Sequence, residues 1–341
     1  IFGLYPSSEE LREKLKNLKI KLKKIKTNSV EGILLRTHYK DLETDRFGVA
    51  SAKCMQRNSF IDRTITNITS ETGILIDDKE GILSEYRKQY QQLFQSAGHD
   101  SDAINEFLFE KPYGQADCFD KQNLSSKITV EEVVSAIRSF KGKKSPGEDG
   151  IPIEFYSKFI NVLAPFLALL YNEIFNRECM TSSMYTGVIT QIYKGSGSRS
   201  NRKNWRPLTI LNVDYKILAK ILFNRLRPII SKIVHPDQTC SVPGRDIRDG
   251  LSKIYNVINY TDDQDIDGLL LSVDHMSAFD IIEWEYIYQV IDYFGLGENF
   301  RKWIETIYKN HHVCAKLEIN GFVTESFKVS RGIRQGCPLS A

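Results

Sequence analysis

The chain has 341 residues, of which 26% are charged and 41% hydrophobic, and a net charge of +3. This length is sufficient for a full core and two or more domains, and the composition is ordinary for a soluble protein. No stretch approaches the roughly 20 apolar residues of a membrane-spanning helix, so we expect no membrane partner. The chain starts at Ile1 without a signal peptide, and we expect it to be part of a longer polypeptide.

The six cysteines are far apart and contain no CxxC pair. This spacing argues against a disulfide framework and a structural zinc site, and favours a reducing, intracellular compartment. The only local cluster of histidine and cysteine, His311 to Cys314, has a spacing that suits no common zinc site. We therefore expect no disulfide partner.

Positive charge is concentrated in one block of the chain. Between Lys194 and Lys232 there are ten cations and one anion, Asp214. The cations are Lys194, Arg199, Arg202, Lys203, Arg206, Lys216, Lys220, Arg225, Arg227 and Lys232. Such a block suits a polyphosphate partner, because lysine and arginine gain by releasing its counterions. The alternative is a solvated basic face, and charge alone favours that alternative.

Residues 1–100 are predicted to form a mostly helical, basic linker region. Apolar residues recur between Leu11 and Ile25 at spacings of four and three, which is typical of an apolar seam on a helix. Basic residues surround this seam, so the helix either packs on its own domain, which we favour, or lies along nucleic acid. A hairpin or turn over residues 65–76 and an amphipathic helix over residues 79–94 complete this region.

An irregular connector is predicted over residues 101–126, and a compact domain over residues 127–341. Thr129, followed by two glutamates, opens a helix that we expect to end near Phe140. Asn320-Gly321 predicts a two-residue hairpin turn. The other expected elements are a loop over 141–150, a helix over 153–176 with a break near Pro165, a strand over 186–193, a loop over 195–202, a helix over 215–227 that Pro228 ends or kinks, a strand over 268–274, and helices over 283–294 and 299–309.

Asp274 follows the apolar run Leu269 to Val273, which predicts a strand buried on both faces. A carboxylate at the end of such a strand is held by rigid backbone, where a hard cation such as Mg²⁺ can bind and keep positions open for phosphate. The alternative is an aspartate in a turn or cap, and spacing alone favours that alternative. Asp280, with Glu283 three residues later, predicts a capping box at the next helix.

Six segments of the compact domain occur in order. They are residues 143–150, Asn204-Trp205-Arg206-Pro207-Leu208-Thr209, Asp214-Tyr215-Lys216-Ile217, Pro243-Gly244-Arg245, residues 274–280, and residues 331–340 with Arg334-Gln335-Gly336. Together they resemble the reverse transcriptase of a non-LTR (LINE-type) retrotransposon, over about residues 127–341. The earlier portion resembles, less specifically, the linker that follows the endonuclease domain of such polyproteins.

The resemblance implies an α+β fold, namely a right-hand polymerase with fingers and an incomplete palm. The palm is expected to be incomplete because the Tyr-x-Asp-Asp hairpin of such enzymes does not occur before Ala341. The implied function is RNA-directed DNA polymerase: template-directed addition of deoxynucleotides to a primer 3′-hydroxyl in the full-length parent. This fragment alone is expected to be inactive. An RNA template, a DNA primer or target and dNTPs are the implied partners, and two Mg²⁺ ions are the implied cofactor.

The predicted site residues take their roles from the resemblance. Asp274 matches the first metal-binding, catalytic aspartate of the palm. Phe279 matches the aromatic ring beneath the sugar, which leaves no room for a 2′-hydroxyl. Gln335 and Gly336 match the segment that lines the nucleotide and template pocket, where a glycine allows close backbone approach.

Basic residues complete the predicted site. Lys194 and Arg206 match the cations of the fingers that hold the incoming triphosphate, a task that suits the forked guanidinium of arginine. The residues expected to contact the nucleic acid are Lys141, Lys143, Lys144, Arg202, Lys203, Arg225 and Arg245. The chain departs from the family at residues 275–277, where charged residues are usual, and at residues 195–197, where the loop is less basic than in many members.

Two alternatives remain beside the polymerase interpretation. The first is a truncated or domesticated fragment that binds RNA or DNA and catalyses nothing. The second is a group II intron maturase or related polymerase, which residues 214–217 and 331–340 disfavour. A nuclear location is favoured over a cytoplasmic one for the full-length parent, because such elements commonly prime at a nick in chromosomal DNA.

Overall fold

The computed structural model describes residues 64–70, 72–109, 112–309 and 312–340. A boundary after Ile65 separates two units, and every described helix and strand lies in the second, residues 66–341. The predicted helix from Leu11 to Ile25, with both of its interpretations, lies outside the described residues. The predicted domain boundaries at residues 100 and 126 stay predictions.

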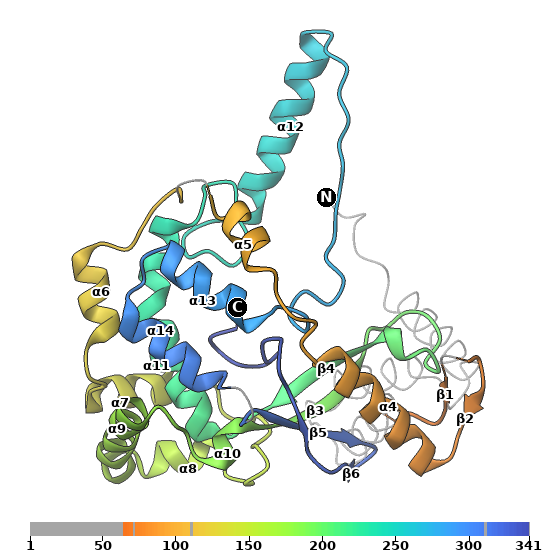
Figure 1. Ribbon diagram of the computed structural model, residues 1–341, viewed down its shortest axis with the longest axis vertical. Helices are drawn as coiled ribbons and strands as arrows, with labels where there is room; N and C mark the ends of the chain where they lie inside the picture. The colour runs from red at the N-terminus through yellow and green to blue at the C-terminus, as the bar shows by residue number, and fades with distance from the viewer. Residues whose placement is uncertain (1–63, 71, 110–111, 310–311, 341) are drawn as a thin grey trace, which may run out of the picture. The chain divides into compact units, whose positions relative to one another are not determined.

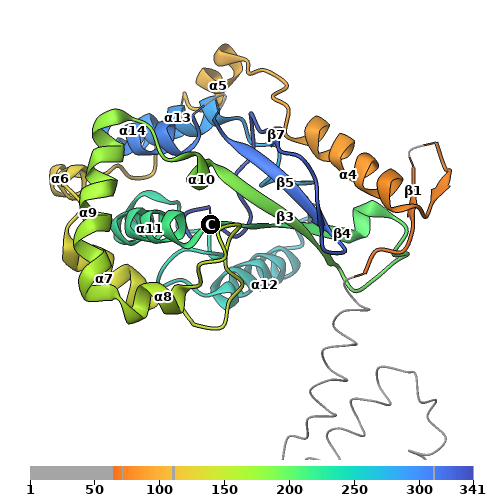
Figure 2. The same ribbon diagram turned by 90° about the horizontal axis from the view of Figure 1, so that it is seen from below.

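A mixed five-stranded sheet forms the centre of this unit (Figure 2). Its strands are β3 (Thr186–Tyr193), β4 (Trp205–Ile210), β5 (Cys314–Ile319), β6 (Phe322–Val323) and β7 (Phe327–Lys328). Strand β3 is central, antiparallel to β4 and parallel to β5. The predicted strand over residues 186–193 is therefore confirmed. Its run of β-branched and aromatic residues suits a strand that is paired along both edges.

Two hairpins follow the sequence prediction. Asn320 and Gly321 have φ angles of 53° and 82° and join β5 to β6, where Ile319 pairs with Phe322. Positive φ at both central residues is what this tight turn requires, and asparagine and glycine tolerate it best. The hairpin predicted within residues 65–76 is also present, as the antiparallel pair β1 (Ile68–Thr69) and β2 (Leu75–Ile76).

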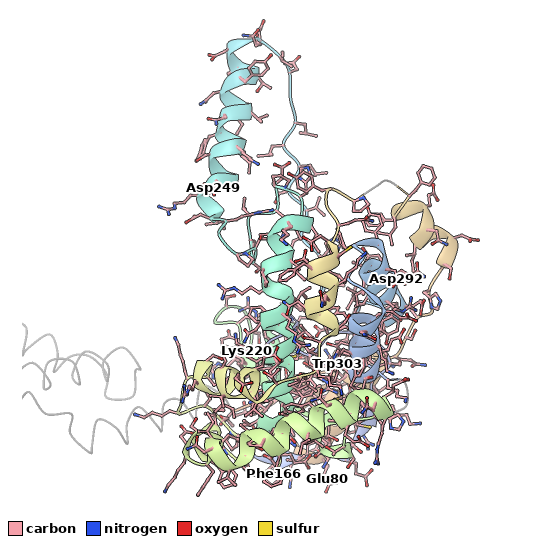
Figure 3. All side chains as sticks on the ribbon, turned by 90° about the vertical axis from the view of Figure 1, so that its left-hand side faces the viewer. Glu80, Phe166, Lys220, Asp249, Asp292 and Trp303 are labelled. Atoms are coloured by element: carbon pink, nitrogen blue, oxygen red, sulfur yellow. The ribbon has the colours of Figure 1, made fainter. Side chains whose placement is uncertain are left out.

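A layer of helices forms the main core. Figure 3 shows α11 beside α6, with Lys220 on α11, and it shows α9 with Phe166. Helix α9 packs on α7 and α14, and α13 packs on α14. The bounds are α6 (Cys118–Ser125), α7 (Val130–Ser139), α9 (Ile160–Arg177), α11 (Val213–Ile233), α13 (Trp284–Tyr293) and α14 (Glu298–Ile307). The combination of a helical layer and a mixed sheet confirms the expected α+β class. None of the helices in the described residues is both long and apolar enough to cross a bilayer.

Local capping signals set several helix ends. Thr129 caps α7 and forms a capping box with Glu132, as predicted. Asp117 and Asp120 form the same motif at α6, so residues 118–125 are helical although the sequence suggested irregular structure there. A short helix, α5 (Ser101–Phe107), also lies within the predicted connector.

The two prolines expected to break helices lie inside them. The break near Pro165 falls instead at Phe159, between α8 (Ile153–Lys158) and α9. A proline removes only one backbone donor from the helix. Buried residues on both sides, including Ala164 and Leu167, keep α9 on the core. Pro228 lies within α11, and Ile229 and Ile233 beyond it are buried, so the helix continues for the same reason.

One part of the unit stands apart from this core. Helix α12 (Ile247–Asp263) projects away from the sheet and helices, and the chain returns from its tip in an extended form (Figure 1). The return segment is residues 266–275, and no strand among the described residues pairs with it. Leu269 is 93% exposed. The prediction of a strand buried on both faces over residues 268–274 is therefore wrong for this structure, because a strand needs a partner to form its ladder and to cover its side chains.

Candidate functional site

Three segments meet beside the sheet, and they carry several of the predicted site residues. The amide of Ile333 donates to the carbonyl of Phe279 at 2.7 Å, and the amide of Gly332 donates to that of Ile282, also at 2.7 Å. The amide of Thr209 on β4 donates to the carbonyl of Gln335 at 2.8 Å. The backbone thus joins residues 279–282, residues 331–336 and β4, although they are far apart in the sequence.

Asp280 lies at the centre of this junction. Gln335 Nε2 donates to both oxygens of the Asp280 carboxylate, at 3.0 and 3.2 Å. Burial raises the pKa of this carboxyl, and the hydrogen bond from Gln335 partly offsets the rise. The prediction that Asp280 caps a helix is wrong: Glu283 is the N-cap residue of α13, while the amide of Asp280 bonds to Ser277 in a turn. Its carboxylate therefore serves the junction instead of the helix.

A cleft opens at the junction. It is lined by the 331–335 segment and by Phe94, Pro207, Thr209 and Asp280. Arg334 holds the segment from below: its guanidinium donates to the carbonyls of Met184 and Tyr185 and lies 4.9 Å from the centre of the Tyr215 ring. This role of Arg334 was not predicted from the sequence, where its position before Gln335 in the 331–340 segment was the available signal.

Gly336 lies close to the backbone of β4. Its φ angle is 112°, and a Cβ atom at this position would lie 2.6 Å from the carbonyl oxygen of Thr209. Both the backbone conformation and the space exclude other side chains without rearrangement. Gly336 therefore lets the 331–336 segment lie directly against β4.

Lys194 and Arg206 lie on one face of the β3–β4 pair. Arg206 pairs with Ile192, and the amide of Lys194 donates to the carbonyl of Asn204, so the pairing extends to the ends of both strands. Side chains alternate between faces, which places Lys194, Ile192 and Arg206 together. Pro207 and Thr209, which line the cleft, belong to the opposite face. The structure therefore brings the two cations near each other but does not turn them toward the carboxylate of Asp280.

Asp274 and Phe279 are exposed. Asp274 lies in the extended return segment, and Phe279 remains 44% exposed although its backbone joins the junction. In the described part of the chain, no group of three or more histidine, cysteine, aspartate or glutamate side chains gathers in a way that could hold a metal ion. A site for two metal ions needs more carboxylate ligands than Asp274 alone supplies.

The basic residues predicted to contact nucleic acid fall into two groups. Lys141, Lys143 and Lys144 are exposed on the turn-rich loop after α7, and Lys203 is exposed before β4. Three arginines are instead engaged with the protein. Arg202 is an example, because its guanidinium forms a 3.2 Å ion pair with Glu85 on α4 (Lys79–Leu93), with 9% of its side chain exposed.

Arg245 closes the end of α11. Its guanidinium donates to four carbonyl groups, those of Ser231, Val234, His235 and Gln238. Carbonyls at the end of a helix lack partners within the helix, so a cation there satisfies them and interacts favourably with the helix dipole. The geometry gives Arg202 and Arg245 structural roles that the sequence did not reveal.

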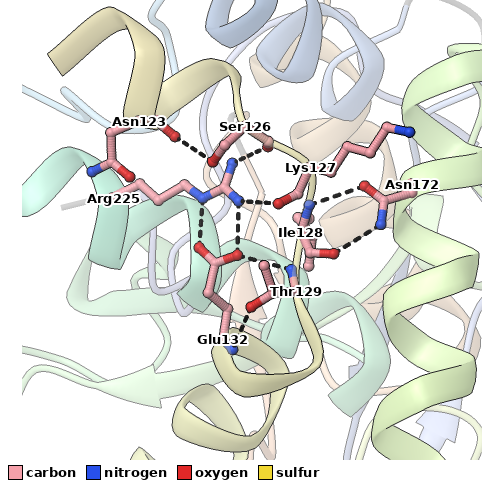
Figure 4. A network of polar contacts seen from close by, with 8 residues as sticks. All are labelled: Asn123, Ser126, Lys127, Ile128, Thr129, Glu132, Asn172 and Arg225. Atoms are coloured by element: carbon pink, nitrogen blue, oxygen red, sulfur yellow. Dashed lines mark hydrogen bonds and ion pairs between the residues drawn. The ribbon is translucent and has the colours of Figure 1, made fainter. Parts of the chain in front are cut away.

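Arg225 is the clearest correction. Figure 4 shows its guanidinium held between Glu132, Ser126 and Lys127. Nε and one terminal nitrogen donate to the two carboxylate oxygens of Glu132 at 2.6 and 2.8 Å, and the carbonyls of Ser126 and Lys127 accept the other bonds. Only 3% of the side chain is exposed. The predicted contact with nucleic acid is therefore wrong for Arg225, which ties α11 to the start of α7.

Comparisons with known proteins agree with this geometry. Residues 192–341 match the family model described as reverse transcriptase (RNA-dependent DNA polymerase), and they contain β4, Asp274 and the whole junction around Asp280. The chain is 32% identical over 278 residues to the transposon TX1 uncharacterized 149 kDa protein of Xenopus laevis, a match that covers 82% of this chain and 21% of that protein. These matches support a reverse transcriptase of the non-LTR retrotransposon type over residues 192–341.

Two further relatives of this reverse transcriptase region carry retrotransposon names. The Pol polyprotein from the type-1 retrotransposable element R2 of Popillia japonica is 24% identical over 215 residues, 62% of this chain and 29% of that protein. The RNA-directed DNA polymerase from the mobile element jockey of Drosophila melanogaster is 28% identical over 101 residues, 30% of this chain and 11% of that protein. The chain thus spans less than a third of each of these relatives. The matches do not favour a non-catalytic binding fragment.

Proposed function

We propose that this chain provides the fingers and part of the palm of an RNA-directed DNA polymerase, which adds deoxynucleotides to a primer 3′-hydroxyl in the complete protein of a LINE-type element. The junction of residues 279–282, residues 331–336 and β4 carries the proposal. Each of these three segments resembles a segment of the family, and their backbones are hydrogen-bonded to one another. In a fold that shared these short motifs by chance, the three segments would not be expected to lie side by side.

The nucleotide is proposed to contact both Phe279 and Arg206. Phe279 is partly exposed and available to contact the sugar, where its ring would exclude a 2′-hydroxyl. Lys194 and Arg206 share a strand face and have exposed side chains, which suits them to hold a triphosphate. Gln335 and Gly336 form the floor, because Gly336 lies against β4 and Gln335 is fixed by Asp280.

Asp274 is proposed as a ligand of a catalytic Mg²⁺ ion. Its exposed carboxylate in an extended segment is an oxygen donor of the kind that Mg²⁺ prefers. Such ions, when bound, would activate the primer hydroxyl and stabilise the leaving pyrophosphate. Asp274 by itself supplies too few ligands for two ions. Further ligands have to come from elsewhere in the complete protein.

The template and primer are proposed to be an RNA and a DNA strand. Lys141, Lys143, Lys144 and Lys203 are the exposed cations of the predicted set and can approach phosphates without losing a protein partner. A nuclear location of the complete protein is proposed on the resemblance alone. Fluorescence microscopy of the tagged protein tests that location, and exclusion from the nucleus would contradict it.

Primer extension by the complete protein tests the polymerase proposal. We expect Asp274→Asn to abolish extension on an RNA template, because an amide is a weaker ligand for Mg²⁺ than a carboxylate. Asp267→Asn is the matched control, since Asp267 is also an exposed aspartate in the return segment. Undiminished extension by Asp274→Asn would reject the metal assignment. Absence of extension by the unmodified protein would reject the function itself.

A further inference from the structure

The end of α4 is hydrogen-bonded to the beginning of the 331–336 segment. The amide and the hydroxyl of Ser330 both donate to the carbonyl of Phe94, at 2.9 and 3.1 Å. Arg331 Nε donates to the carbonyl of Leu93 at 2.8 Å. These carbonyls belong to the end of the helix, where no further backbone amide of the helix is available to donate to them, and the positive guanidinium suits the negative end of the helix dipole.

Glu283 joins the same contact from a third direction. Its carboxylate accepts from the hydroxyl of Ser96 at 2.7 Å and from the amide of Ala97 at 3.1 Å. It also forms a 3.5 Å ion pair with Arg331, and both side chains are only 17% exposed. Partial burial strengthens such charge-assisted bonds relative to those on an open surface. We name this set, formed by residues 93–97, Glu283, Ser330 and Arg331, the α4 latch.

The α4 latch lies at the ends of both segments that form the candidate site. Glu283 follows directly on residues 279–282, which carry Phe279 and Asp280. Arg331 directly precedes Gly332 and Ile333, whose amides bond back to Ile282 and Phe279. Phe94, at the end of α4, also lines the cleft. A shift of the latch would therefore displace Phe279 and Gln335 relative to β4.

Helix α4 is itself fixed to the sheet. Its Tyr90 hydroxyl donates to the side chain of Gln191 on β3 at 3.0 Å, and both residues are buried. Tyr86, Tyr90 and Phe94 form a stacked row that packs toward the sheet. The helix precedes residues 192–341 in the sequence and lies outside the family match. It nevertheless provides a rigid support to which the two site segments are bonded.

We propose that Glu283, Ser330 and Arg331 are positioning residues for the incoming nucleotide. By binding to α4, they fix the positions of Phe279 and Gln335 relative to β4. The inference rests on the proposed polymerase function. None of the three residues touches the nucleotide. They act by holding the segments that do, and small displacements of such groups have large effects on binding and reactivity.

Steady-state primer extension with the complete protein tests the latch. We expect Arg331→Ala and Glu283→Ala each to raise KM for dNTP about fivefold to tenfold, with kcat changed less than about twofold. Arg87→Ala is the matched control. It removes a 3.6 Å ion pair between α4 and Glu325 that lies outside the latch, and should leave both constants unchanged.

The variants also separate positioning from stability. A purely structural role would lower the folded fraction, measured by circular dichroism, and with it the apparent kcat at an unchanged KM; that result would overturn the inference. Ser330→Ala removes only a hydroxyl, so it keeps the test decisive if the alanine variants of the charged residues unfold. Here too an unchanged KM overturns the inference. If the unmodified protein extends no primer, the proposed function fails together with the inference, whereas extension with an unchanged KM in every folded variant rejects the latch alone.

Discussion

Two regions of the molecule carry apolar sequence patterns but differ in how far their side chains are buried. One is the sheet with its helical layer, and the other is the arm formed by α12 and residues 266–275. In the first region, Tyr171, Ile189, Tyr215 and Leu222 are fully or almost fully buried. In the second, no residue of α12 is buried, and the leucines at 269 to 271 are all largely exposed. Figure 3 shows the difference, since the side chains of α12 beyond its base at Asp249 project into open space.

This contrast shows that an apolar sequence pattern favours burial, but whether the side chains are buried depends on a strand or helix elsewhere in the fold that can cover them. Strand β3 pairs with β4 along one edge and with β5 along the other, and its Val188 and Ile189 side chains are buried. The return segment has unpaired backbone groups and an exposed apolar run within the described structure. Large exposed apolar patches commonly mark a surface that another segment covers. The two regions therefore predict very different responses to the same kind of mutation.

The largest effect is expected for a buried ion pair in the first region. Arg225→Ala should lower the free energy of unfolding by about 3–5 kcal/mol, because it leaves Glu132 and two carbonyls without this partner. Arg227→Ala, at an exposed position of the same helix, is the control and should change stability by less than about 0.5 kcal/mol. Urea unfolding followed by circular dichroism measures both. Equal effects would show that burial of Arg225 does not matter.

A single type of substitution compares the two regions directly. Leu222→Ala in the core should cost about 2–4 kcal/mol, since it removes buried methyl groups and leaves a cavity. Leu269→Ala in the return segment should cost less than about 0.5 kcal/mol, because the side chain is already in water. The same urea titration applies. A large loss for Leu269→Ala would mean that the return segment is covered in solution, and would break the comparison.

The smallest effect on stability is expected from the ionisation of Asp280, where the two regions join. Burial raises the pKa of this carboxyl in the folded chain, so the folded state holds the proton more tightly than the unfolded state. The stability of the unmodified chain should therefore fall, relative to Asp280→Asn, as the pH rises above the ordinary aspartate pKa of about 4. Urea unfolding of both proteins between pH 4 and 7 measures the difference. A difference that stays constant, or that reverses in sign, contradicts a raised pKa.

Local chemistry explains which sequence predictions are confirmed. The capping box at Thr129, the turn at Asn320-Gly321 and the strand over residues 186–193 each depend on residues close together in the chain. The helices over residues 283–294 and 299–309 are likewise present as α13 and α14, within two residues at each end. The helices continue through Pro165 and Pro228 because burial of neighbouring residues outweighs the loss of one backbone bond.

In the candidate site, too, features that depend on local sequence were predicted and features that depend on tertiary contacts were not. The segments that form it could be recognised from their amino-acid motifs. These segments contain Asp274, Phe279, Gln335 and Gly336, whose roles remain proposals. Which cations are free could not be recognised. Arg202, Arg225 and Arg245 have the same charge as Lys141 or Lys203, but their partners come from distant segments: Glu85, Glu132 and the last carbonyls of α11.

The sequence by itself determined several local features: the strand over residues 186–193, the turn at Asn320-Gly321, the capping box at Thr129, and the match of residues 192–341 to the reverse transcriptase family. The tertiary structure alone decided which charges are buried, that Asp280 binds Gln335 instead of capping a helix, and that α4 is bonded to both segments of the candidate site. The physical reason is that capping and turn formation depend on neighbours along the chain. Burial, pairing and pKa depend on neighbours in space, which only the folded chain brings together.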